Sequence, residues 1–94
     1  MKVRFEWNED KNEQNIIKHG ISFREAQKAF LDKNRIIAED ITHSKVEKRY
    51  YCFGKLKGGV LTVRFAFRYN RIRIIGAGYW RKGKIIYEKQ NQIH

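Results

Sequence analysis

A long hairpin in the second half of the chain most strongly limits the folds available to it. Residues 60–68 and 71–79 each alternate between apolar and polar side chains, which is the pattern of half-buried β-strands. Only Tyr69 and Asn70 separate the two runs, and so short a connection joins antiparallel neighbours. The sequence therefore predicts an antiparallel sheet built around this hairpin.

The segment before residue 35 predicts one strand followed by two helices. Residues 1–5 alternate weakly and end in an aromatic cluster, which indicates a short strand. Asn8 can cap a helix whose first turn is acidic, and Gly20 suits its end. Ser22 and Glu25 form a capping box for a second helix. Its buried stripe is predicted to be Phe23, Ala26 and Phe30, with Ala29 beside it.

The first predicted helix is almost entirely polar. Only Ile16 and Ile17 are obvious packing residues in its body, so we expect the helix to lie across a surface on these two side chains. Beyond the helices, residues 35–40 and 48–56 return to a period of two and predict two strands joined by a polar loop. The tail is ambiguous, because Gly83 argues against a continuous helix while residues 85–87 suit a strand or a short helix.

These elements together predict an α+β fold for a single domain spanning residues 1–94. The order is strand, helix, helix and then four strands. We expect the two N-terminal helices to pack on one face of a mainly antiparallel, twisted sheet of four to five strands.

The positive charge is concentrated in one half of the chain. Residues 1–47 contain nine Lys/Arg and nine Asp/Glu, whereas residues 48–94 contain twelve Lys/Arg and a single acid, Glu88. The second half therefore carries the whole formal net charge of +11. Such asymmetry favours a polyanionic partner, with RNA or DNA first and an acidic protein or anionic membrane surface as alternatives.

Several features predict a cytoplasmic protein without a metal or another cofactor. Cys52 is the single cysteine and lies in an apolar run, so we expect a buried thiol in a reducing compartment. No signal sequence is apparent, and no apolar stretch approaches the ~20 residues that span a bilayer. The spacing of Cys and His fits no zinc site, and acids near the basic segment are too few for magnesium.

Four arginines are expected on the face of the hairpin that points away from the core. With a two-residue turn, Arg68 stands opposite Arg71, and Arg64 stands opposite Ile75. Like charges that face each other destabilise a sheet, and guanidinium groups grip phosphates well. We therefore expect the cluster to bind an anion. A solvated basic face is the alternative, which the absence of acids from residues 60–87 disfavours. The cluster comprises Arg64, Arg68, Arg71 and Arg73.

A recognisable motif occupies the N-terminal quarter of the chain. Residues 5–26 read Phe-Glu-Trp-Asn-x-x-Lys-x-x-x-Asn-x-x-Lys-His-Gly-Ile-Ser-Phe-x-x-Ala, of which residues 18–23 are the most specific part. The motif closely resembles the BrnT toxins of bacterial type II toxin–antitoxin modules. The likeness covers nearly the full length of the chain. It continues through Asp40, His43, Ser44, Arg49-Tyr50, Gly54, the hairpin with residues 71–75, and Tyr87-Glu88.

The resemblance implies a RelE-like α+β ribonuclease that cleaves RNA and inhibits translation and growth. It also implies an antitoxin with a ribbon-helix-helix DNA-binding part, and operator DNA bound through the complex. Where the family usually reads Ile-Ile-Ser-Ala-Arg, this chain has Gly76 and Gly78 in place of the serine and the arginine. The segment before Tyr87 is also about one residue shorter. A non-catalytic nucleic-acid-binding or antitoxin-docking relative is therefore the alternative.

Cleavage without a metal needs groups that move protons and cations that hold the charge of the phosphorane. Arg68 and Arg73 are predicted to hold that charge, because arginine does not titrate in the useful range. His19 and Tyr87 are the predicted proton-transfer groups. Packing is the alternative for Tyr87, and a favourable helix end is the alternative for His19. No role is assigned to the other two histidines, His43 and His94.

Further RNA contacts are predicted from basic residues and one aromatic residue. Lys18 and Lys84 are also the next candidates for proton transfer. The indole of Trp7 could stack on a base, with a place in the core as the alternative. The predicted RNA-binding residues are Arg64, Arg71, Lys18, Arg81, Lys84 and Trp7.

Overall fold

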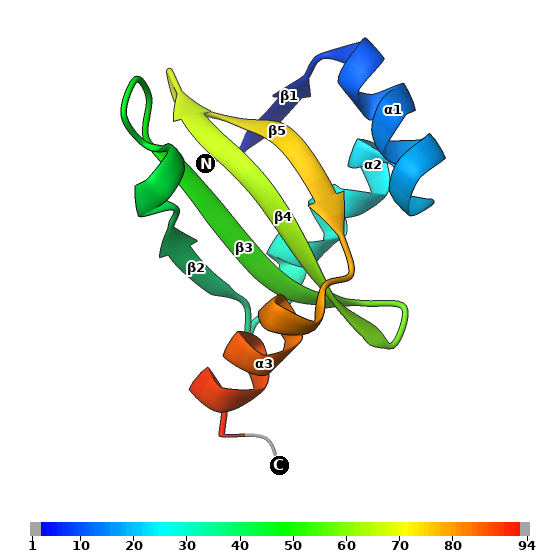
Figure 1. The fold of residues 1–94 in the computed structure, drawn as a ribbon, viewed down its shortest axis with the longest axis vertical. Helices are drawn as coiled ribbons and strands as arrows, with labels where there is room; N and C mark the ends of the chain where they lie inside the picture. The colour runs from blue at the N-terminus through cyan, green and yellow to red at the C-terminus, as the bar shows by residue number, and fades with distance from the viewer. Residues whose placement is uncertain (1–2, 93–94) are drawn as a thin grey trace.

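A five-stranded mixed sheet forms the centre of the structure, a computed structural model that describes residues 3–92 (Figure 1). The strands are β1 (Arg4–Trp7), β2 (Ile36–Glu39), β3 (Arg49–Leu56), β4 (Gly59–Arg68) and β5 (Arg71–Gly78). The helices are α1 (Glu9–His19), α2 (Phe23–Ala26) and α3 (Arg81–Gln90), with 3₁₀ segments η1 (Gln27–Leu31) and η2 (Ile41–His43). The spatial order of the strands is β1-β5-β4-β3-β2. β1 is parallel to β5 and the other neighbouring pairs are antiparallel.

This arrangement confirms the predicted α+β class and the mainly antiparallel sheet. The first strand begins and ends later than predicted, because its pairing with β5 covers residues 4–7. Residues 1 and 2 of the predicted strand lie outside the described part of the chain. Within residues 3–92, no helix has both the length and the apolar character needed to cross a membrane.

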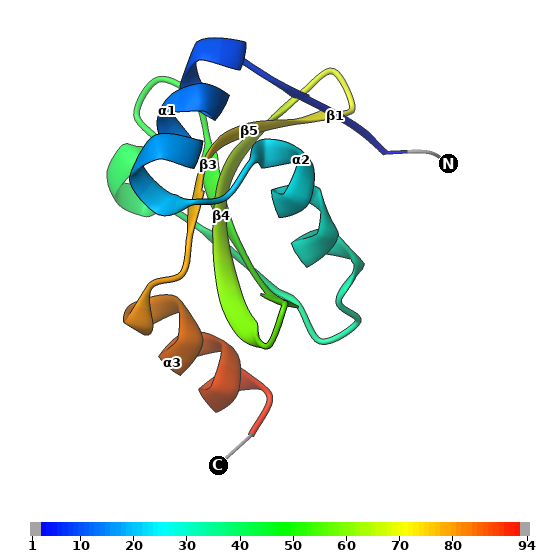
Figure 2. The same cartoon turned by 90° about the vertical axis from the view of Figure 1, so that its right-hand side faces the viewer.

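Helical segments cover both faces of the sheet (Figure 2). The α2–η1 segment packs on one face, where Phe23 and Phe65 belong to the main core cluster. On the opposite face α3 packs against β3 and β4, and Tyr87 joins Phe53 in a second cluster. Cys52 lies in the main cluster, since successive residues of a strand face opposite sides. Burial raises the pKa of the Cys52 thiol to about 12, as expected for a structural cysteine.

The ends of the N-terminal helices confirm the sequence signals. The Asn8 side chain accepts a hydrogen bond from the backbone of Lys11, and Gly20 ends α1 with φ 68°. At α2, both hydrogen bonds of the Ser22–Glu25 capping box are present. Because these contacts join residues at most four positions apart, they follow from the local sequence.

The inward face of α1 differs from the prediction. Ile16 and Ile17 are 44% and 83% exposed, and Asn12 and Asn15 are the buried residues instead. The Asn15 amide donates to the carbonyls of Ile21 and Ala77, both at 2.9 Å, and accepts from the Ala77 N–H at 3.1 Å. The prediction of inward isoleucines is therefore wrong, because α1 docks on backbone groups that only a polar side chain can satisfy.

The ambiguous tail forms α3 with Gly83 inside it, so the argument against a continuous helix is wrong. A Cβ atom added at Gly83 would lie 2.1 Å from Thr62 Oγ1 and 2.9 Å from the Phe53 ring. The glycine is thus required by the close approach of α3 to β3 and β4. Its helical cost of roughly 1 kcal/mol is offset by the packing of the second cluster.

Candidate active site

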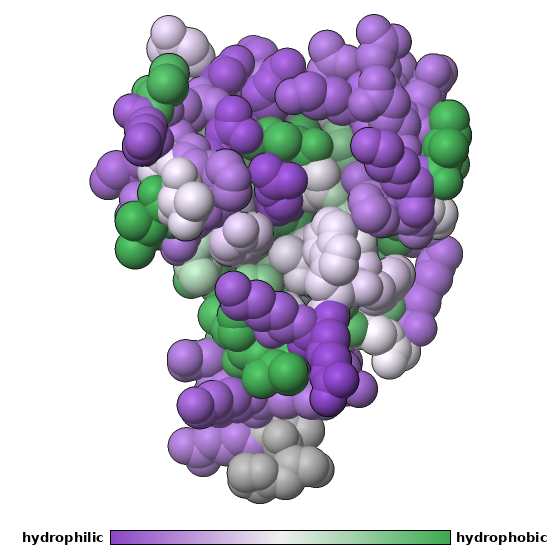
Figure 3. Space-filling model, in the orientation of Figure 1, coloured by the Kyte–Doolittle hydropathy of each residue, from purple (hydrophilic) through white to green (hydrophobic). Residues whose placement is uncertain are grey.

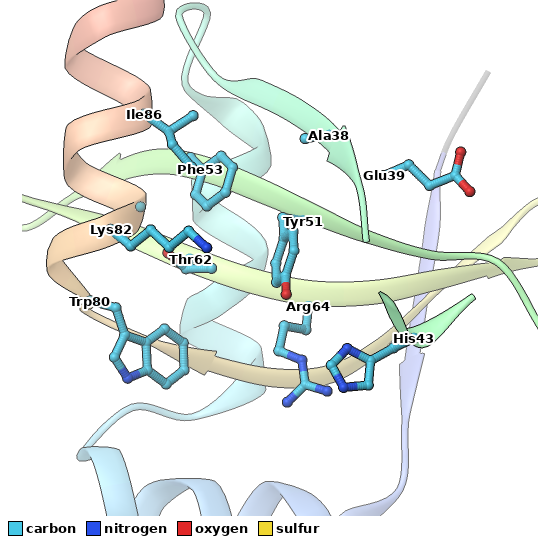
Figure 4. Close-up of a pocket in the computed structure, with 11 residues that line it drawn as sticks. Ala38, Glu39, His43, Tyr51, Phe53, Thr62, Arg64, Trp80, Lys82 and Ile86 are labelled. Carbon is cyan, nitrogen blue, oxygen red and sulfur yellow. The ribbon is translucent and has the colours of Figure 1, made fainter. Parts of the chain in front are cut away.

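A groove opens on the face of the sheet that α3 partly covers (Figure 4). Its volume is about 610 Å³, and we name it the α3 groove. Phe53 and Ile86 line its apolar end, while Arg64, His43 and Lys82 bring charge or hydrogen-bonding capacity to it. In the space-filling view, hydrophilic side chains cover much of this face, and paler side chains gather beside the start of α3 (Figure 3). The groove also contains Ala38, Glu39, Tyr51, Thr62, Trp80 and Gly83.

A second hollow lies between α1 and β5. It has a volume of about 250 Å³, and we name it the α1 pocket. The end of α1 brings Lys18 and His19 to this pocket. Arg64 and Trp80 line both hollows, so each contacts the space on both sides. The remaining residues of the α1 pocket are Lys11, Gln14, Asn15, Ile75 and Gly76.

The hairpin register confirms two of the three pairs that a two-residue turn predicts, Arg68 with Arg71 and Ala66 with Arg73. Arg68 lies opposite Arg71, as predicted, but Arg64 lies opposite Gly76 instead of Ile75. A β-bulge between Arg64 and Phe65 accounts for the one-residue difference.

Three of the four hairpin arginines form ion pairs with two acids from other elements. Arg68 donates two hydrogen bonds to Glu47, at 2.6 and 3.2 Å. Arg73 and Arg71 donate to Glu6 at 3.0 and 3.4 Å. The bond from Arg73, followed by that from Arg71, holds the pKa of Glu6 below its usual value despite some desolvation. Residues 60–87 contain no acid, as counted from the sequence, but carboxylates reach the arginines from β1 and from the loop before β3, so that count does not disfavour a solvated basic face.

Arg64 differs from the other three arginines. Within residues 3–92 it forms no ion pair with a carboxylate. Its guanidinium points into the space beside His43 (Figure 4). The side chain is half-buried, so water screens its charge less than that of a fully exposed arginine. Arg64 is thus the hairpin arginine best placed to receive an external anion.

His43 lines the α3 groove and is a candidate site residue that the sequence reasoning missed. Its Nδ1 lies 2.8 Å from Oδ2 of Asp40, a buried carboxylate. Burial alone would raise the pKa of Asp40, but interactions with His43 and then Tyr51 hold it below its usual value. The spacing of Asp40 and His43 was a signal for this contact, although only the fold brings the pair to Arg64.

Trp80 is another candidate site residue that the sequence reasoning missed, and it lines both hollows. Its ring fills the space next to Gly78. Its indole makes an edge contact with the His19 ring, with centroids 5.1 Å apart. A Cβ atom at Gly78 would lie only 2.7 Å from the Trp80 ring, so the space beside residue 78 is filled by this indole. At Gly76 the nearest atom to such a Cβ is Arg64 Cδ at 3.9 Å, which leaves room for a small side chain.

Tyr87 lines neither of the two hollows. It is 1% exposed, and its hydroxyl donates to Asp32 at 2.6 Å. Burial and then this bond raise the pKa of Tyr87 to about 12, the opposite of activation by arginines. The geometry therefore argues against the predicted proton transfer by Tyr87 and favours a packing role.

The other predicted contacts lie around the hollows or away from them. Trp7 packs against the core, with its ring 6.3 Å from that of Phe23, which favours the core alternative. Arg81 and Lys84 are exposed on α3 and line neither hollow, whereas Lys82 lines the α3 groove. The structure thus brings together Arg64, Lys18 and His19 from the predicted set.

Metal-ligating side chains do not gather in the described part of the chain. No group of three or more His, Cys, Asp or Glu residues there could hold a metal ion. Glu6 and Glu47, the acids beside the hairpin arginines, are already engaged in ion pairs with those arginines.

Comparison with protein families places the chain in a known family. Residues 7–83 match the family described as the ribonuclease toxin BrnT of type II toxin–antitoxin systems. A search of curated proteins gave no match. The matched range contains Arg64, His19, His43 and Trp80, and it ends within the first turn of α3.

Proposed function

This chain belongs to the BrnT family of ribonuclease toxins of type II toxin–antitoxin systems. We propose that it cleaves RNA at a site centred on Arg64 and that the cleavage needs no metal. Family membership makes RNA the substrate and an antitoxin the partner. We expect the toxin to act on RNA in the cytoplasm and to have no membrane partner.

The observation that carries this proposal is the position of Arg64 between the two hollows. A phosphodiester at this arginine would have the α3 groove on one side and the α1 pocket on the other. Its guanidinium can donate to two phosphate oxygens at once, and Lys18 adds a second cation in the α1 pocket. These cations would hold the extra negative charge of the phosphorane.

His19 remains a proposed proton-transfer group because it lines the α1 pocket next to Arg64. An imidazole changes charge near neutral pH and can therefore give or take a proton during the reaction. Trp80, in edge contact with His19, offers an aromatic surface on which a base could stack. Neither role requires the serine and arginine that Gly76 and Gly78 replace.

We assign the other hairpin arginines to RNA binding. Arg68, Arg71 and Arg73 retain partly exposed side chains and could contact phosphates further along the strand. Their carboxylate partners reduce the electrostatic gain of such contacts, so we place them second to Arg64. The exposed Arg81 and Lys84 could extend the same path along α3.

The proposed antitoxin has a ribbon-helix-helix DNA-binding part, and the complex would bind operator DNA. The net charge of +11 supports an acidic toxin-binding segment in such a partner. Co-expression with the neighbouring reading frame, followed by co-purification, tests this pairing. An adjacent gene product with another DNA-binding fold would overturn the assignment of antitoxin type.

RNA cleavage in the presence of a metal chelator tests the proposed activity. Purified protein should cut RNA in excess EDTA and leave 2′,3′-cyclic phosphate and 5′-hydroxyl ends, the products of attack by the 2′-oxygen. Intact RNA at a large excess of folded protein would refute the proposal. Salt-sensitive RNA binding without cleavage, together with normal growth on induction, would favour the non-catalytic relative.

A further inference from the structure

We propose that His43, oriented by Asp40, is the general base of RNA cleavage and works with His19 as the general acid across Arg64. This inference rests on the proposed function and assigns a role to a histidine in a loop between β2 and β3. It follows from three observations on the described residues. These are the Asp40–His43 contact, the fixed backbone around it, and the position of both histidines relative to Arg64.

The contact with Asp40 fixes the orientation of the imidazole. Nδ1 of His43 lies 2.8 Å from the buried carboxylate, while the His43 side chain as a whole is 57% exposed. A carboxylate at Nδ1 favours the tautomer with the proton on that nitrogen, which leaves the lone pair on Nε2. Nε2 is then free to accept a proton from a bound molecule, and Asp40 stabilises the imidazolium that results.

The backbone that carries the pair is held from both sides. Ser44 Oγ donates to the carbonyl of Asp40 at 2.6 Å and accepts from the Arg49 N–H at 2.9 Å. The Asp40 N–H donates to the carbonyl of Arg49 at 2.7 Å. These bonds tie η2 to the start of β3, so the histidine is held by more than its own side-chain contact.

His43 and His19 line two different hollows that share Arg64. His43 lines the α3 groove together with Arg64, and Figure 4 shows the imidazole and the guanidinium at the same end of that groove. His19 lines the α1 pocket, and Arg64 lines both spaces. A phosphodiester bound to this arginine would therefore have one imidazole in each adjoining hollow. The other titratable or charged groups that line the groove with His43 are Glu39, Tyr51 and Lys82.

The two histidines balance the protons of the first step. Neutral His43 takes the proton of the 2′-hydroxyl, and the 2′-oxygen forms a bond to phosphorus. The bond from phosphorus to the 5′-oxygen breaks, and protonated His19 gives its proton to that oxygen. The products are a 2′,3′-cyclic phosphate and a 5′-hydroxyl, with His43 now protonated and His19 neutral. Proton exchange with water restores the starting states.

Two variants and two substrates separate the roles of the histidines. His43→Gln and His19→Gln are compared with His94→Gln, a matched change outside the described residues. Each protein is given an RNA with one normal linkage and an RNA with sulfur in place of the 5′-oxygen at that linkage. The thiolate leaves without needing a proton, so a missing general acid matters little for the second RNA.

His43→Gln should lose about two to four orders of magnitude in kcat on both RNAs, and His19→Gln only on the normal RNA. Asp40→Asn should lower kcat with KM unchanged, as expected for a positioning residue. Cleavage by His43→Gln at the rate of the unchanged protein would overturn the inference while leaving the proposed function intact. Rescue of His43→Gln by the sulfur-containing RNA would also overturn it, because His43 would then be an acid.

If the melting temperature of His43→Gln is well below that of the unchanged protein, the pH dependence of the unchanged protein provides a second measurement that needs no variant. Its kcat should rise with pH as the base loses its proton and fall as the acid loses its own, giving a bell-shaped profile. A profile without the rising limb would overturn the assignment of His43. An inert unchanged protein would overturn the proposed function, and this inference with it.

Discussion

Replacement of Arg64 by alanine tests which hairpin arginine faces the reacting phosphate. Arg64 has no carboxylate partner within residues 3–92, so its removal breaks no ion pair there. The melting temperature should therefore stay close to that of the unchanged protein. The rate should fall steeply, because a preorganised donor to the phosphorane typically contributes about 3 kcal/mol. That energy corresponds to about a hundredfold loss in kcat at 25 °C.

Two comparisons make the Arg64 measurement specific. Arg68→Ala removes a cation that is already paired with Glu47 through two hydrogen bonds. We therefore expect it mainly to weaken RNA binding and to reduce the dependence of that binding on salt. Arg24→Ala changes an exposed arginine on α2, away from both hollows, and should leave cleavage unchanged. Arg64→Lys keeps the charge without the two-pronged donor and should recover only part of the rate.

The assay is single-turnover cleavage of an end-labelled RNA in EDTA, with circular dichroism melting of every variant. If Arg64→Ala cleaves within a few-fold of the unchanged protein while Arg68→Ala loses about a hundredfold, the reasoning from ion pairing is refuted. The original sequence-based choice of Arg68 would then stand. If both variants lose cleavage equally, the two arginines act together on one phosphate and the distinction drawn from Glu47 is wrong.

Three further predictions concern stability and pH. Asn15→Ala should destabilise the fold by roughly 2–3 kcal/mol in urea unfolding, because it leaves buried backbone groups unpaired; an unchanged midpoint would contradict this. Gly83→Ala should lower the melting temperature, since the new Cβ atom would meet Thr62 Oγ1, whereas Lys84→Ala on the exposed side should not. Tyr87→Phe should keep cleavage and lose the hydrogen bond to Asp32. Because the folded-state pKa of Tyr87 is raised from 10.0 to about 12, the stabilisation of the fold by this hydroxyl is present below pH 10 and is lost as pH rises toward 12. Urea unfolding at several alkaline pH values should therefore show a smaller decline for Tyr87→Phe, and identical declines would contradict the role of this hydroxyl.

Local signals in the sequence predicted the elements that depend on near neighbours. The caps at Asn8 and Ser22 and the hairpin around residues 69–70 form through residues a few positions apart, so their patterns are legible before folding. The resemblance to BrnT toxins likewise depends on a run of residues and is confirmed by the family match over residues 7–83. The alternation of strand residues also placed the four arginines on one face.

Packing across the fold decided what a local pattern could not express. Gly83 has a low helix propensity, yet it lies inside α3. Glycine is needed at this position because a larger residue would collide with Thr62, against which α3 packs. The inward residues of α1 are amides because their partners are backbone groups of Phe23, Ile21 and Ala77, the last 62 positions away from Asn15. Hydrophobicity alone selected Ile16 and Ile17 and could not anticipate those partners.

The electrostatics of the candidate site were likewise set by tertiary structure. The acids that neutralise Arg68 and Arg73 lie 21 and 67 positions away in the chain, so a count over residues 60–87 could not include them. Within residues 3–92 the same folding leaves Arg64 without such a partner, and it brings His43 and His19 to the two hollows that Arg64 lines. The sequence by itself determined the α+β class, the central hairpin, the family and the excess of positive charge. Only the tertiary structure decided which of the hairpin arginines are paired with carboxylates among residues 3–92, because electrostatic energy depends on distance in space and on burial.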